Sequence, residues 1–448
     1  MTDFTQTRIF RFLLLGSVCL WTLGPYYAYD LPSAIQQGFM DYTGLNDVQY
    51  NMMYSVYSFS NFLSVCFGGY AIDKLGHVFG GLTFQSFVCV GLSIFSAACA
   101  NKNYLWILIG RGIYGVGLGN LTVCQNAVVS HNFKGKELAL AFGLVISFSR
   151  LGSVLNFYFS SDIAAATSIS FAVWLGTAMS FFSFLFVVVF TLLNRRRDRY
   201  ACMDESMDVS PVSEVGAPSP VKPKAAGRKI KLEDVKSFRL EFWLVGCITA
   251  LFYACIFPFV AIATDYMQEE RGFTEDEASS ATGVIYLLSM FFSPFLGKLI
   301  DRIGKRLLLT LIAASVTMCA HVMLVFTPVS PWVVVFLIGC SYTVTASSIW
   351  SCVPLVVRLR EVGTALSLVT AIQMGFISCI NAIVGIVKEK TGYPQVSLVF
   401  CSIAFACVVL TSVTIVVDKR RCQVLNGTDK SGIFSENEEK GLTAQDEA

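Results

Sequence analysis

A nine-residue pattern that occurs twice limits what this chain can fold into more than any other feature. Gly69-Tyr-Ala-Ile-Asp73-Lys-Leu-Gly76-His77 returns as Gly297-Lys-Leu-Ile-Asp301-Arg-Ile-Gly304-Lys305, so each aligned pair is offset by 228 residues. Solenoid repeats have periods of about 20–50 residues, so the offset indicates a different architecture. It predicts two halves of one membrane bundle that descend from a single unit and are related in the parallel sense.

The composition places the chain in a bilayer. Hydrophobic residues make up 54% and charged residues 14% of the chain, whereas soluble domains carry about 25% charged residues. The basic residues sit in short clusters between apolar runs, so a nucleic-acid partner is not expected. The 15 cysteines show no metal-ligand spacing, and we find no catalytic triad or phosphate loop. We therefore expect a protein without enzymatic activity, metal or cofactor, whose partners are membrane lipid and a small molecule.

Apolar runs long enough to cross a membrane, about 20 residues each, predict an all-α membrane protein with twelve transmembrane helices in two pseudo-symmetric six-helix halves. The N-terminal half is expected over 1–193, a cytosolic linker over 194–240, the C-terminal half over 241–417 and a cytosolic tail over 418–448. The predicted spans are 11–31, 48–70, 79–99, 104–128, 137–160, 170–193, 242–264, 277–299, 307–327, 332–357, 364–387 and 395–417.

Basic residues in the connecting segments predict the orientation, because cytosolic loops carry an excess of Lys and Arg. With both termini on the same side, 27 of the 33 basic residues face that side. Both termini are therefore predicted to be cytosolic. The linker has the composition of a mostly disordered segment, apart from a short surface helix expected near Lys229–Lys236.

The duplicated pattern lies in two equivalent cytosolic loops and is predicted to gate access from that side. Its glycines allow a tight turn and close helix contacts, and its carboxylates can bind the positive end of a neighbouring helix. Arg111, in a span with glycines at Gly115, Gly117 and Gly119, is expected to face the bundle interior. The predicted gating residues are Gly69, Asp73, Gly76, Arg111, Gly297, Asp301 and Gly304.

Arg150 is the residue most suggestive of solute binding. It lies about 20 Å into the fifth span at 1.5 Å per residue, and no acidic residue at helical spacing neutralises it. A planar guanidinium at this depth suits a carboxylate or phosphate held by two parallel hydrogen bonds. The open alternative is an acidic partner on another helix.

Asp30 is the only carboxylate well inside an apolar window. It is expected to bind a substrate amine, pair with an arginine or take a proton, unless it lies hydrated at the non-cytosolic interface. Several aromatic residues are candidates to line a cavity beside it. The predicted substrate-binding residues are Arg150, Tyr29, Asp30, Tyr57, Tyr253 and Trp350.

These features resemble the major facilitator superfamily. The paired Gly-x-x-x-Asp loops and Arg111-x-x-x-Gly115-x-Gly117 match its signatures over the whole membrane portion. Within the superfamily the chain is most similar to lysosomal carriers of dipeptides. The segments that carry this finer likeness include Tyr29-Asp30-Leu-Pro32, Phe133-Lys-Gly-Lys-Glu-Leu138, Ser149-Arg150-Leu-Gly-Ser153 and Phe257-Pro-Phe259.

The resemblance implies transport of short peptides out of the lysosome by uniport, together with a single-span glycosylated accessory protein. It also implies that Arg150 receives the peptide carboxylate and that a glutamate in the fourth span receives the amine. In this chain the glutamate position is Gly119. Either another group such as Asp30 binds the amine, or the solute lacks one.

Two other interpretations of the same sequence remain open. A proton-coupled carrier would use Asp30 as its titrating group. A membrane receptor or scaffold would keep the fold without transport, and the acidic tail after Val417 favours it. We expect uniport because embedded carboxylates, the usual proton relays of transporters, are nearly absent.

Overall fold

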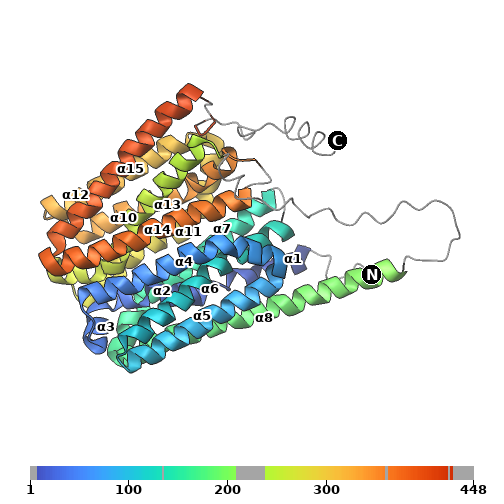
Figure 1. Cartoon of the computed structure of the whole chain (residues 1–448), viewed down its shortest axis with the longest axis horizontal. Helices are drawn as coiled ribbons and strands as arrows, with labels where there is room; N and C mark the ends of the chain where they lie inside the picture. Colours follow the sequence, from blue (N-terminus) through green and yellow to red (C-terminus); the bar gives the residue numbers. More distant parts are fainter. Residues whose placement is uncertain (1–7, 134–135, 208–237, 359–361, 422–423, 427–448) are drawn as a thin grey trace.

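The computed structural model describes residues 8–133, 136–207, 238–358, 362–421 and 424–426. Within these ranges the chain is a bundle of long helices without a strand (Figure 1). The first half contains α1 (Arg8–Cys19), α2 (Leu23–Ala34), α3 (Gln36–Thr43), α4 (Asp47–Leu75), α5 (His77–Ala100), α6 (Tyr104–Asn132), α7 (Lys136–Ala166) and α8 (Ile169–Met207). The second contains α10 (Leu240–Arg271), α11 (Glu275–Ile303), α12 (Arg306–Phe326), α13 (Pro331–Ser348), the 3₁₀ helix η2 (Trp350–Leu355), α14 (Val362–Thr391) and α15 (Tyr393–Arg421).

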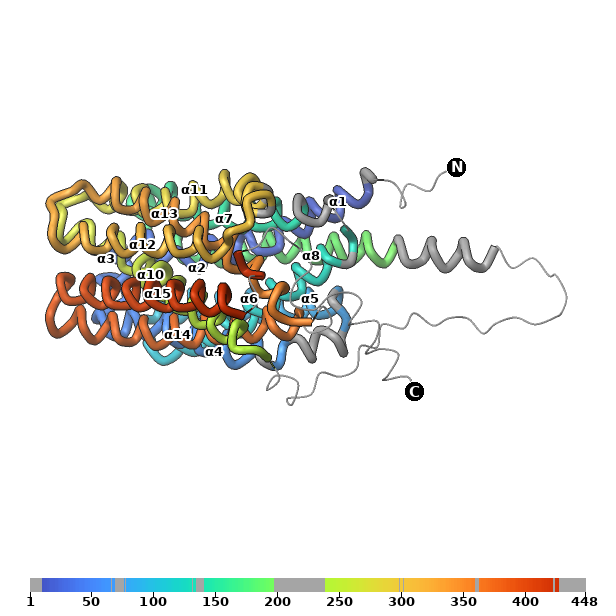
Figure 2. The backbone as a smooth tube through the Cα atoms, turned by 90° about the horizontal axis from the view of Figure 1, so that it is seen from above, coloured from blue at the N-terminus to red at the C-terminus, as the bar shows by residue number. Residues whose placement is uncertain are grey.

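The predicted all-α membrane fold is confirmed. Eleven segments of the described residues are long and apolar enough to span a bilayer. The second predicted window, 48–70, corresponds to α4. This helix has 29 residues and extends for about 43 Å at 1.5 Å per residue, which is long enough to cross a bilayer. The helices run along one common direction, with α3 at one end of the bundle and α1 at the other (Figure 2).

Contacts between the halves follow the symmetry that the repeat implies. The second span of the first half, α4, packs on the fifth span of the second half, α14, and α7 packs on α11 in the same way. Exchanging the two halves turns one of these contacts into the other. Such mutual pairing of equivalent helices is the arrangement expected of two copies of one unit.

Three elements differ from the sequence-based expectation. The first window is two helices, α1 and α2, separated at 20–22. The tenth ends as α-helix at Ser348 and continues as η2, which contains Pro354. Pro354 has no N–H to donate to the carbonyl of Trp350, four residues earlier, and its ring would clash with that carbonyl in an α-helix. The helix α8 continues to Met207, so the first residues of the predicted linker are helical. The surface helix expected at Lys229–Lys236 lies outside the described residues.

The duplicated pattern gives both copies a positive φ at its last glycine. Gly76 joins α4 to α5 with φ 78° and ψ 149°, and Gly304 joins α11 to α12 with φ 64° and ψ −133°. This region of backbone space is essentially restricted to glycine. A Cβ at Gly297 would meet no atom within 4 Å, so close helix contact is not the reason for glycine there. Gly69 and the Asp73 and Asp301 side chains lie outside the described set.

The glycines of the fourth span allow close packing of helices. A Cβ at Gly115 would lie 2.3 Å from the Tyr57 carbonyl oxygen on α4, and one at Gly117 would lie 2.7 Å from the Val88 nitrogen on α5. Real Cβ atoms do not approach other atoms this closely. The missing side chains therefore let α6 pack against α4 and α5 at backbone distance.

Candidate functional site

Arg150 lies on α7 among three tyrosines that come from both halves. Its guanidinium carbon is 5.4 Å from the ring centre of Tyr26, 5.5 Å from that of Tyr286 and 5.3 Å from that of Tyr342. Tyr26 belongs to α2, whereas Tyr286 and Tyr342 belong to α11 and α13. Aromatic faces stabilise a cation through their quadrupoles, which offsets part of the cost of placing this charge inside the bundle.

The guanidinium of Arg150 retains unused hydrogen-bonding capacity. Its Nε and Nη1 atoms are enclosed and have no hydrogen-bond partner, while the side chain as a whole is partly exposed. No ion pair joins it to a carboxylate of the described residues. Leaving charged donors unsatisfied inside a protein costs free energy, and an anion that accepted these hydrogen bonds would remove that cost.

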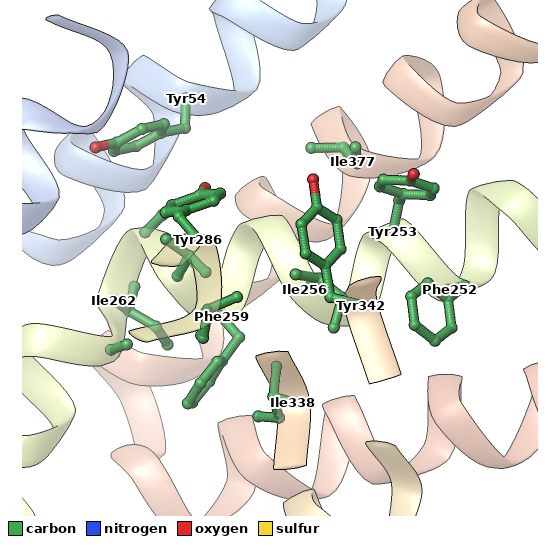
Figure 3. Close-up of a cluster of buried hydrophobic side chains, with 14 of the residues drawn as sticks. Tyr54, Phe252, Tyr253, Ile256, Phe259, Ile262, Tyr286, Ile338, Tyr342 and Ile377 are labelled. Carbon is green, nitrogen blue, oxygen red and sulfur yellow. The ribbon is translucent and has the colours of Figure 1, made fainter. Parts of the chain in front are cut away.

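The second half contributes an ordered aromatic group next to this arginine. Trp350 Nε1 donates a hydrogen bond of 2.9 Å to the Tyr253 hydroxyl, and the Tyr253 and Tyr342 rings meet edge to face at 5.9 Å. In Figure 3 the Tyr342 hydroxyl points between Tyr286 and Tyr253. That hydroxyl is enclosed without a partner. Tyr253 and Trp350, both predicted site residues, therefore belong to the aromatic group next to Arg150.

Asp30 lies inside the bundle and not at a hydrated interface. Its side chain is 2% exposed, and its Oδ1 accepts a hydrogen bond of 3.4 Å from the Tyr286 hydroxyl, across the two halves. Its Oδ2 is enclosed without a partner. The charges of Arg150 and Arg111 both act on this carboxylate. Asp30 forms no close ion pair with either embedded arginine among the described contacts.

Arg111 lies wholly within the first half. It is 0% exposed, its guanidinium carbon is 4.4 Å from the ring centre of Phe95 and 5.3 Å from that of Tyr54, and its Nη1 donates to the Tyr29 carbonyl oxygen at 3.5 Å. These contacts tie α6 to α2, α4 and α5. The predicted residues Tyr29 and Tyr57 belong to this group, with ring centres 4.8 Å apart, and not to the rings around Arg150.

Gly119 is enclosed by Asn61 and offers no room for a side chain. A Cβ at this position would lie 2.1 Å from Asn61 Oδ1, an oxygen that is itself enclosed without a partner. The neutral Asn61 amide from α4 therefore fills the space where the family resemblance implied an amine-binding glutamate.

A charge cluster at the α3 end of the bundle was missed by sequence reasoning. Lys388 Nζ bonds Asp265 Oδ2, lies 2.7 Å from Asp47 Oδ1 and lies 3.7 Å from Glu269 Oε1. The Tyr393 hydroxyl donates to the same Asp265 oxygen. Asp265 is 2% exposed, yet it falls one residue beyond the predicted seventh window. Tyr26 was also missed, although it lies three and four residues before Tyr29 and Asp30 and hence on the same helix face.

Among the described residues, no group of three or more His, Cys, Asp or Glu side chains is arranged to hold a metal ion. The enclosed polar atoms described above are guanidinium, hydroxyl, amide and carboxylate groups. Their chemistry is that of binding a small polar solute by charge and hydrogen bonds.

Sequence comparison with known proteins also indicates a membrane transporter. The family model for the Major Facilitator Superfamily matches residues 13–380. The human lysosomal dipeptide transporter MFSD1 is 31% identical over 419 residues, covering 91% of this chain and 85% of the relative. The zebrafish (Danio rerio) lysosomal dipeptide transporter MFSD1 is also 31% identical, over 417 residues, covering 90% of this chain and 86% of that relative.

Solved structures share the fold at low sequence identity. A crystal structure of the peptide transporter POT in complex with sulfate has a TM-score of 0.63 and 13% identity, covering 92% of this chain and 96% of that one. A crystal structure of a mutant of the nucleoside transporter NupG has a TM-score of 0.62 and 13% identity, covering 90% of this chain and 99% of that one. At this identity the likeness extends to the fold alone.

Proposed function

Since the chain belongs to the major facilitator superfamily, we propose that it moves dipeptides, or related small carboxylated solutes, across the lysosomal membrane by alternating-access uniport. The curated relatives that support this proposal are named lysosomal dipeptide transporters. The observation that carries it is the Arg150 guanidinium, with enclosed donor atoms that no protein group satisfies.

In the proposed complex the solute carboxylate binds the edge of the Arg150 guanidinium. The rings of Tyr26, Tyr286 and Tyr342 occupy the surroundings of the cation, and its Nε and Nη1 atoms still have hydrogen bonds to give. Two parallel charge-assisted bonds match the geometry of a carboxylate. Tyr253 and Trp350 are proposed to contact the rest of the solute from the second half.

The amine of a peptide is proposed to be received by Asp30 instead of by the fourth span. Gly119 has no side chain and the Asn61 amide beside it carries no charge, whereas Asp30 Oδ2 is enclosed without a partner. Asp30 is 2% exposed, so its access to solute requires the two halves to move apart around the Tyr286 hydrogen bond. Tyr29 and Tyr57 are proposed to support this side of the site.

The orientation and partners are part of the same proposal. Both termini are placed in the cytosol, and the α3 end of the bundle faces the lysosomal lumen. The two six-helix units are 1–193 and 241–417, joined by the linker and followed by the tail. The glycines and carboxylates of the duplicated loops are proposed to gate the cytosolic side. Arg111, seven residues after the start of α6 at the α3 end, is proposed as a separate gating residue. A single-span glycosylated accessory protein is the proposed protein partner.

The experiment that tests the function compares a dipeptide with its C-terminal amide. The chain is reconstituted in liposomes, and flux of the two solutes is measured at equal concentration. We expect saturable flux of the dipeptide and a fall in affinity on the order of 100-fold for the amide, because the amide loses the charge-assisted bonds to Arg150. Equal transport of both solutes contradicts the proposal.

A proton-coupled carrier is the second candidate, because Asp30 is an enclosed carboxylate whose Oδ1 accepts a long hydrogen bond from Tyr286. Uniport predicts that an imposed pH gradient across the liposome does not drive uptake above equilibrium. We further expect Asp30→Asn to reduce flux about tenfold, as loss of a hydrogen bond to a charged group does, without changing the response to the gradient. Accumulation driven by the gradient, abolished in Asp30→Asn, would establish proton coupling instead.

A further inference from the structure

The charge cluster at the α3 end joins the two halves through one lysine. Lys388, in the last turn of α14, is 4% exposed and contacts the carboxylates of Asp47 and Asp265. Asp265 belongs to α10 in its own half, whereas Asp47 begins α4 in the other half. The Lys388 ammonium also lies 4.6 Å from the Tyr393 ring centre. The Lys388 ammonium is thus shared between Asp265 in its own half and Asp47 across the interface between the halves.

The backbones of the two halves touch at the same level. A Cβ at Gly385, one turn before Lys388, would lie 2.8 Å from Asn51 Cβ and 3.1 Å from the Asp47 carbonyl oxygen. Asn51 is 0% exposed, and its Nδ2 donates to that same carbonyl at 2.9 Å. The ion pair therefore forms where α4 and α14 pack so closely that a side chain at position 385 would not fit.

Two further hydrogen bonds cross the halves near this end. The Tyr50 hydroxyl donates to the Ala261 carbonyl oxygen at 2.8 Å, and the Ser33 hydroxyl donates to the Val260 carbonyl oxygen. Tyr50 and Ser33 are 0% and 1% exposed. Together with the Gly385 contact they show that the described residues close the bundle at the α3 end.

We propose that Lys388 and Asp47 are gating residues, and that their ion pair must break each time the bundle opens at the α3 end. The geometry makes the pair reversible. When α4 moves away, Lys388 keeps Asp265 and Tyr393 as partners, so no bare charge is left in the second half. The released Asp47 lies in the first turn of α4, where the helix end stabilises a carboxylate.

The proposal rests on the alternating access of the proposed function but not on the identity of the solute. Its test is therefore a measurement that needs no solute. Amide hydrogen exchange of the full chain in lipid nanodiscs, followed by mass spectrometry, reports how often the α4 and α14 ends open. Failure to transport dipeptides would leave this measurement unchanged, so the two failures are distinguishable.

Two variants loosen the contact by different physics. Asp47→Asn removes the charge across the interface and leaves Lys388 paired with Asp265, whereas Gly385→Ala retains every charge and introduces a methyl group where none fits. The matched control is Glu269→Gln, because Glu269 lies 3.7 Å from Lys388 but belongs to the same half. It changes the charge of the cluster by the same amount without crossing the interface.

We expect roughly tenfold faster exchange in the first turns of α4 and the last turns of α14 for both loosening variants, the size of coupling measured for close charge pairs across interfaces. Exchange in the interior of α12 should stay as in wild type, and Glu269→Gln should match wild type throughout. Wild-type exchange at both ends in Asp47→Asn would overturn the proposal. Acceleration that extends equally to α12 would overturn it as well, since that pattern indicates general loss of stability.

Discussion

Replacing Arg150 by alanine is expected to abolish saturable dipeptide flux in reconstituted liposomes. The guanidinium supplies enclosed donors that no protein group uses, and each hydrogen bond to a charged group contributes about 1.5–3 kcal/mol. Loss of two such bonds corresponds to a decrease in affinity of at least 100-fold, since 1.4 kcal/mol is a factor of about ten. The measurement is the concentration dependence of initial flux.

Arg150→Lys distinguishes planar recognition from charge alone. Lysine retains the positive charge but presents a compact ammonium in place of a planar fork, so we expect flux to persist with an affinity about tenfold lower than in wild type. The control is Arg195→Ala, which removes an exposed arginine on α8 and should transport as wild type does. If Arg150→Ala and wild type carry the dipeptide equally, Arg150 is not the anion site.

Replacing Lys388 by methionine is expected to lower the thermal stability of the purified protein strongly. Lys388 is 4% exposed and contacts Asp265, which is 2% exposed. Methionine fills a similar volume but leaves the Asp265 carboxylate enclosed without its counter-charge. Breaking a buried ion pair by removing one partner costs about 3–5 kcal/mol. The measurement is the unfolding temperature in detergent, compared with wild type.

The double variant Asp265→Asn/Lys388→Met is expected to recover most of this loss. It removes both charges together, and replacing a buried pair by neutral groups is often near neutral for stability. Recovery would show that the unpaired carboxylate, and not lost packing, causes the instability of Lys388→Met. A double variant as unstable as the single one would contradict this account and assign the effect to packing around position 388.

The sequence was sufficient for the fold because hydropathy alone determines where a chain can cross a bilayer. Unpaired backbone groups are not tolerated in lipid, so each long apolar run has to form a helix. The break between α1 and α2, the helix α3 and the continuation of α8 to Met207 were not predicted. These features depend on local turns and on polar residues at the ends of spans, where apolar composition carries little information.

The candidate site was predicted only at positions where one residue is unusual by itself. Arg150 stands out because a charge in an apolar run is rare and costly. Its three tyrosine neighbours come from α2, α11 and α13, and the rotation of each helix is set by packing that one sequence does not reveal. Asp265 was missed because its partner Lys388 is 123 residues away and its position fell outside the predicted window.

The tyrosines around Arg150 have a consequence for how tightly an anion is held. One of them moves with the arginine, and the other two belong to the opposite half, so a swing of the halves strips the cation of two aromatic faces. A desolvated cation gains about 2 kcal/mol from such a face, and water that reaches the guanidinium when the halves part weakens its attraction to a bound carboxylate. An anion at Arg150 is thus expected to be held most tightly while the halves are together and to be released as they part.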